Sequence, residues 1–188
     1  MLAAIFFLLT LAYWKYPQGA KKTRLSYFAV GIIALLLFRA VVLSILLYGA
    51  WKRNVPGKFL LPPYQPLGYF LGYAFTHFFA SFVLSLASAL VCAAVLKSFA
   101  RTRENMFRPG EISLFISCAM LIRWPLMIPY TAAIFFSSAL RAVSKTIILQ
   151  RDARVIMGPM MLANAVPFVF FGTWILRLPI FQLLAMPL

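Results

Sequence analysis

Long apolar stretches alternate along the chain with short polar connections rich in Lys, Arg and Pro. A helix needs roughly 20 apolar residues to cross the hydrocarbon core of a bilayer, and several stretches approach or exceed that length. The pattern therefore predicts an all-α protein, a polytopic membrane helix bundle. The apolar stretches are Met1–Tyr13, Leu25–Ala50, Leu67–Leu96, Ile112–Leu140 and Val155–Ile175, with an apolar tail over Leu176–Leu188.

The connections between these stretches are of two kinds. Three of them are basic, with four Lys or Arg residues each: Trp14–Arg24, Lys97–Gly110 and Arg141–Arg154. The fourth, from Trp51 to about Pro66, contains four prolines. Proline removes a backbone donor and fixes φ, so we expect this segment to be a connection and not a helix.

The stretch Ile112–Leu140 is interrupted by Arg123-Trp124-Pro125 and again by Pro129. It is either one kinked helix or two short helices joined by a tight turn. A double crossing puts the three basic connections on one side, with twelve of the eighteen basic residues, and the positive-inside bias favours that asymmetry. Ile112–Ile122 is then short, because about 11 residues cover only about half the hydrocarbon thickness.

We therefore expect about six transmembrane or re-entrant segments in a single integral membrane domain over residues 1–188. The N-terminus is expected outside and the three basic connections in the cytoplasm. The predicted location is an integral membrane, the bacterial inner membrane.

Composition strengthens the membrane interpretation. Of 188 residues, 64% are apolar and 11% are charged, whereas a soluble domain has about a quarter of its residues charged. The net charge is +15, but the basic residues sit between apolar runs and not on one face of a polar fold, which argues against a nucleic-acid partner. Basic connections attract anionic head groups, so membrane lipids are the expected partners.

The residues available for chemistry are few. The chain has two Cys, one His and three acids, which argues against a zinc or haem site built from this chain alone. We expect no cofactor and no metal. Any acid–base chemistry must draw on Glu104, Glu111, Asp152, His77 or a partner.

Three polar residues lie within or between apolar stretches. Arg39 is near the middle of its span. We expect its side chain to extend to the membrane surface or pair with a neighbouring subunit, or to bind a lipid or substrate anion; otherwise the boundary of the span is misplaced. Arg123 is expected to mark an interface, and His77 to make a hydrogen-bonded helix contact in preference to a proton relay. A protein that handles an anion with Arg39, Arg123 and His77 would bring them together on one cavity.

Glu111 is the candidate catalytic residue. It follows Pro109-Gly110 and opens an apolar helix, where the helix dipole favours a carboxylate. It is either a capping residue or a catalytic or substrate-binding acid.

The segment from Lys97 to Pro129 resembles the second half of the type IV prepilin peptidases, membrane aspartyl proteases with two catalytic aspartates. Arg103-Glu104-Asn105-Met106 resembles the polar loop before the second aspartate, and Pro109-Gly110-Glu111 the end of its Gly-x-Gly-Asp motif. Trp124-Pro125 resembles the Trp after the short helix that follows. The segment Ile156–Ala163, with Gly158 and Pro159, resembles the Pro-Phe-Gly-Pro element of the last helix.

The chain departs from that family at the catalytic pair. The second aspartate is Glu111, and the place of the first, near Tyr13–Pro17, holds no acid. The four-cysteine zinc region of many members is also absent. The resemblance, which covers roughly Leu67 to Gly172, implies a divergent or catalytically inactive relative. If the chain is an enzyme, the resemblance implies a membrane endopeptidase.

Three functions follow from these observations. The first is a prepilin peptidase-like protein of pilus, secretion or conjugation machinery, which binds the apolar leader helix of a pilin-like protein. The second is a non-enzymatic structural subunit that meets carboxylates on other membrane subunits. The third is a small anion- or lipid-handling membrane protein.

Overall fold

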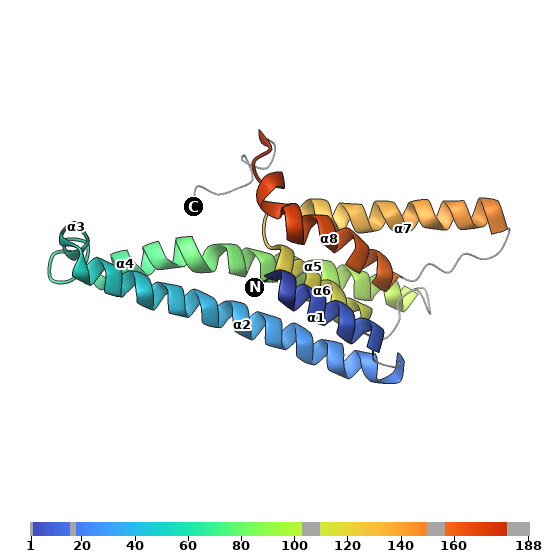
Figure 1. Ribbon diagram of the computed structural model, residues 1–188, viewed down its shortest axis with the longest axis horizontal. Coiled ribbons are helices and arrows are strands. Elements are labelled where there is room, and N and C mark those ends of the chain that lie inside the picture. The colour runs from blue at the N-terminus through green and yellow to red at the C-terminus, as the bar shows by residue number, and fades with distance from the viewer. Residues whose placement is uncertain (1, 16–17, 103–109, 150–156, 180–188) are drawn as a thin grey trace.

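The computed structural model describes residues 2–15, 18–102, 110–149 and 157–179, and these residues form helices without a strand (Figure 1). The expected all-α class is confirmed. The helices are α1 (Leu2–Lys15), α2 (Gln18–Arg53), α3 (Val55–Lys58), α4 (Leu67–Ala74), the π-helical turn η1 (Phe75–Phe79), α5 (Ala80–Thr102), α6 (Glu111–Ile122), α7 (Met127–Leu149) and α8 (Met157–Ile175).

Within the described residues, three helical stretches are long and apolar enough to cross a membrane: Arg24–Arg53, Leu67–Ser98 and Met157–Ile175. They match three of the expected spans and are what a membrane protein requires. The helices α1 and α6 are apolar but shorter. The expectation of about six segments stays a prediction.

The basic connections are shorter than the sequence suggested. The expected connection Trp14–Arg24 is wrong over most of its length, because α2 already begins at Gln18. Likewise α5 continues to Thr102 and α7 to Leu149. Lys, Arg, Gln and Ala are good helix formers, so a helix can run on past its apolar stretch.

The proline-rich connection is confirmed in outline. Between α2 and α4 the chain turns through the single turn of α3 and a run of tight turns. The stretch Ile112–Leu140 consists of two helices, α6 and α7, joined by a turn at 123–126. The interpretation as two helices joined by a tight turn is therefore confirmed, but the second is not short, because α7 has 23 residues.

α6 is the central helix of the bundle. It packs against α2, α5 and α8, and most of its residues are buried, as in a helix that is apolar all round. Figure 1 shows the starts of α2, α6 and α8 and the ends of α1, α5 and α7 at one end of the molecule. The described helix ends that flank the three basic connections therefore lie at the same end.

The other end of the molecule is thinner. Figure 1 shows α2 and the helix from α4 to α5 running on alone, past the ends of α1 and α6. We call this part the arm: α2 from Ala40 to Arg53, α3, the turn over 59–66, α4 and η1. The arm has its own small core of Leu61, Phe70 and Ala74, with Trp51 packed against it.

Candidate functional site

The carboxylate of Glu111 lies inside the bundle, at the end where the basic connections leave. Glu111 is the first residue of α6 and is 1% exposed. The residue before it, Gly110, has φ 93°, a conformation that glycine adopts at little cost. The Pro-Gly-Glu sequence thus turns the chain sharply into α6 and places the acid in the core.

Glu111 interacts with α8. The backbone N–H of Gly158, in the first turn of α8, donates a hydrogen bond to Glu111 Oε1 over 2.9 Å. The first N–H groups of a helix have no partner within the helix, and the helix dipole favours negative charge there. Glu111 therefore caps α8. The capping expected at the start of its own helix α6 is not found, because α6 has no side-chain cap hydrogen bond and the carboxylate caps α8 instead.

Tyr13, near the end of α1, completes this cluster. A Cβ atom added at Gly158 would overlap the Tyr13 hydroxyl and would lie 2.9 Å from Glu111 Oε1. Tyr13 and Glu111 thus meet over the backbone of Gly158, where only a glycine fits. Tyr13, Glu111 and Gly158 belong to α1, α6 and α8, so the cluster joins three helices.

No second carboxylate joins Glu111 within the described part of the chain. Glu104 and Asp152 lie outside the described residues. The described residues also contain no group of three His, Cys, Asp or Glu side chains that could hold a metal ion. The described cluster can fix α1, α6 and α8 to one another, and it contains one carboxyl group.

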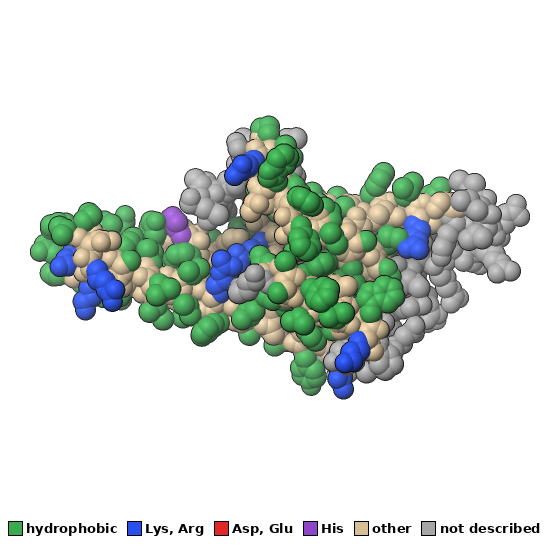
Figure 2. Space-filling view, in the orientation of Figure 1, with side chains coloured by type: hydrophobic (Ala, Val, Ile, Leu, Met, Phe, Trp, Pro, Cys, Tyr) green, Lys and Arg blue, Asp and Glu red, His purple; other side chains and the backbone are tan. Residues whose placement is uncertain are grey.

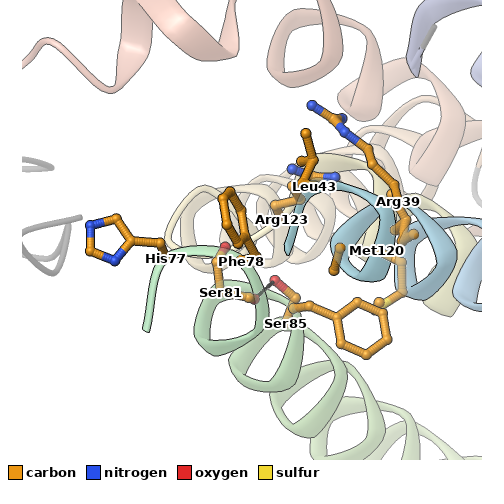
Figure 3. A pocket seen from close by; sticks show the side chains of 11 residues that line it. Arg39, Leu43, His77, Phe78, Ser81, Ser85, Met120 and Arg123 are labelled. Atoms are coloured by element: carbon orange, nitrogen blue, oxygen red, sulfur yellow. Dashed lines mark hydrogen bonds between the residues drawn. The ribbon is translucent and has the colours of Figure 1, made fainter. Parts of the chain in front are cut away.

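A pocket lies at the opposite end of α6. Arg39, His77 and Arg123 all line one cavity of about 290 Å³, which α2, the η1–α5 helix and the end of α6 enclose. Figure 3 shows Arg39 and Arg123 together at one edge of the pocket. All three residues expected to converge in an anion-handling protein therefore line one cavity.

Arg39 and Arg123 reach this pocket in different ways. Arg39 lies within α2, which runs without a break from Gln18 to Arg53. Its side chain is exposed, whereas Arg123 is partly buried. Burial, and then the charge of Arg39, lower the pKa of Arg123. An arginine remains protonated under such a shift, so two like charges face one pocket.

The backbone at Arg123 is strained. Its φ of 68° and ψ of 163° lie in a region that is essentially restricted to glycine, at a cost of about 1–3 kcal/mol for other residues. The turn is held by Ser85 on α5, whose hydroxyl accepts the N–H of Trp124 over 2.7 Å and donates to the carbonyl of Ser81 over 2.7 Å. Ser85 could not be predicted from the sequence, because nothing in the spacing of a helix serine indicates a contact 39 residues away.

His77 lines the pocket without contributing its ring. A ring nitrogen lies 3.0 Å from the carbonyl oxygen of Tyr73, and the ring stacks on Tyr73 with centroids 3.8 Å apart. In Figure 3 the His77 ring points away from the two arginines. The expected hydrogen-bonded helix contact is confirmed.

Comparisons of this chain with protein families, with curated proteins and with solved structures find no match. The site must therefore be interpreted from its own geometry.

Proposed function

We propose that this protein is a non-catalytic relative of the prepilin peptidases in a bacterial inner membrane. It holds the apolar leader helix of a pilin-like protein, or a helix of another membrane subunit, and does not cut it. The observation that carries the proposal is the hydrogen bond from the Gly158 N–H to the buried Glu111 carboxylate, beside Tyr13.

The lack of catalysis follows from the chemistry of the pair. An aspartyl protease needs two carboxyl groups that share a proton, one acting on water and the other on the substrate carbonyl. The resemblance puts the first carboxyl near Tyr13–Pro17, where this chain has no acid. Glu111 is also 1% exposed, so its carboxylate is not accessible from solvent in this structure.

The surface that we assign to the bound helix is a groove on the arm. It has a volume of about 700 Å³ and lies between α2 and the α4–η1 helix. Its lining is almost wholly apolar, with Ile45 on one wall and Leu71 and Phe75 on the other. An amphipathic or apolar helix binds such a groove through side chains at helical spacing.

The catalytic half of the proposal is tested by co-expression with a pilin-type precursor. The mass of the precursor is measured with the wild type and with Glu111→Gln. We expect the uncut precursor in both. Cleavage by the wild type that Glu111→Gln abolishes would show an active protease, and cleavage that persists in the variant would show one that does not use Glu111.

The binding half is tested with a photo-crosslinking residue in place of Ile45, in the groove. The control position is Val30, which is on the same helix and equally exposed but outside the groove; Ile45 is 65% and Val30 is 63% exposed. We expect the precursor to crosslink from position 45 and not from position 30. Equal crosslinking from both positions, or none, contradicts the proposed groove.

A further inference from the structure

The pocket at the end of α6 holds two arginines without a counter-charge. Neither guanidinium of Arg39 or Arg123 has a hydrogen-bond or ion-pair partner among the described residues. The described chain contains one carboxylate, Glu111, and it lies at the far end of α6, about 18 Å away along the helix axis. Charged residues among membrane helices are costly and usually pair or mark a ligand pathway.

The backbone that places Arg123 at the pocket is also strained. A glycine at position 123 would adopt the observed backbone without strain, and the Ser85 hydroxyl holds the turn by accepting the N–H of Trp124. Backbone strain of this kind tends to occur at ligand-binding positions. Position 123 therefore combines a backbone that suits glycine with a side chain that suits an anion.

We propose that the pocket between Arg39 and Arg123 binds the phosphate group of a phosphate monoester. Two guanidinium groups carry two positive charges and offer paired N–H donors to a tetrahedral oxyanion. A phosphate monoester carries about 1.5 to 2 negative charges at neutral pH, so it balances both arginines. A single carboxylate on a partner helix would balance one.

The size and surroundings of the pocket are consistent with this ligand. Its volume of about 290 Å³ is at the lower limit of ordinary small-molecule sites, which suits a head group and not a whole lipid. The chain beyond the pocket is the arm, which exposes apolar side chains along its length and basic ones at its tip (Figure 2). Ile45, Leu46 and Leu71 are each more than half exposed. Basic pockets between membrane helices bind lipid head groups.

The phosphate can be carried by a lipid such as phosphatidic acid or by a small soluble ester, and one experiment separates these sources. The protein in mild detergent is titrated with phosphatidic acid, and bound lipid is counted by native mass spectrometry. Phosphatidylglycerol, an anionic phosphodiester, is the comparison lipid. Glycerol 3-phosphate and inorganic phosphate are then added as soluble competitors.

We expect phosphatidic acid to bind the wild-type protein more tightly than phosphatidylglycerol does. The affinity for phosphatidic acid is expected to fall about tenfold or more in Arg39→Gln and in Arg123→Gln. Arg39→Lys, which keeps the charge but loses the paired donors, is expected to be intermediate. The matched control is Arg53→Gln, which removes the same charge at the tip of the arm, outside the pocket, and is expected to bind as the wild type does.

Displacement by millimolar glycerol 3-phosphate or inorganic phosphate would support the pocket with a soluble ligand, and retention of the lipid would support a lipid ligand. Equal binding of both lipids, an equal loss in Arg53→Gln, or no phosphate binding at all would overturn the proposal. A membrane protein that co-purifies with the chain, requires Arg39 for its retention and prevents lipid binding would also overturn the proposal. The anion in the pocket would then be a carboxylate of that partner.

Discussion

At its first residue α6 buries a carboxylate, and beyond its last residue it leads into a turn that carries an arginine. The two ends of α6 differ in how their ionisable side chains are buried and partnered. Glu111 is almost fully buried and accepts a hydrogen bond from the start of α8, with Tyr13 packed at the same point. Arg123 faces an open pocket beside a second arginine and sits on a strained backbone.

The difference shows what each charge contributes. A buried charge with good partners fixes helices to one another, and removing one partner is costly. A charge that lacks a partner and is held by a strained turn lowers the stability of the folded chain. We infer that the Glu111 end is structural and that the Arg123 end is where a ligand binds.

The largest expected effect is a difference in chemical labelling, because the Glu111 end and the arm are expected to lie on opposite sides of the membrane. Single cysteines placed at Arg101 and Arg151 are expected to react with an impermeant reagent from the same side, the cytoplasm, because both connections leave the bundle at the Glu111 end. A cysteine at Lys58, in the arm, is expected to react from the opposite side. Labelling of positions 101 and 151 from opposite sides would contradict the six-segment arrangement.

The next largest effect is expected at Gly158. In Gly158→Ala the new Cβ overlaps the Tyr13 hydroxyl, so we expect a loss of about 1–3 kcal/mol, measured as thermal stability in detergent. Gly31→Ala is the control, because nothing lies within 4 Å of a Cβ at that position. Adding Tyr13→Leu, which removes the overlapping atoms, should recover part of the loss. Additive losses in the double variant would contradict the packing described for this end.

An effect of similar size is expected for Glu111 itself. Glu111→Leu leaves the N–H of Gly158 buried without an acceptor, at a cost of about 1–3 kcal/mol. Glu111→Gln keeps an acceptor oxygen and should lose less. Thermal unfolding of the two variants in the same detergent compares them directly. Equal stability of the two would show that the hydrogen bond to α8 does not stabilise the bundle.

A substitution at Arg123 is expected to raise the stability of the folded protein, whereas the substitutions at the Glu111 end lower it. Arg123→Gly relieves the strained backbone, so we expect a gain of about 1 kcal/mol in stability together with loss of phosphatidic acid binding. Arg53→Gly, at the last residue of α2, is the control, and it should change neither stability nor binding appreciably. A destabilised Arg123→Gly would indicate that the arginine side chain stabilises its turn.

Most of the fold could be predicted from the sequence, but few of the contacts of Glu111 and Arg123 could. The apolar stretches and the breaks at Pro56–Pro66 and at Arg123-Trp124-Pro125 are local signals, and the structure confirms them. The helix ends were misplaced, because Lys and Arg mark the limit of apolar sequence and not the limit of a helix.

The contacts of Glu111 and Arg123 depend on helices that are distant in sequence. That Glu111 opens a helix could be predicted from Pro109-Gly110. Its cap on α8 and its approach to Tyr13 need the packing of α1, α6 and α8. The positive φ of Arg123 and its support from Ser85 likewise arise from packing. For these features a single sequence holds no local signal.

The contrast between the two ends of α6 is tested most directly by phosphatidic acid binding in three proteins: wild type, Arg39→Gln and Glu111→Gln. Arg39 is exposed and lines the pocket, whereas Glu111 is buried and about 18 Å from it. We predict that Arg39→Gln loses most of the bound lipid and that Glu111→Gln retains it. Retention by Arg39→Gln, or an equal loss in both variants, would contradict the account.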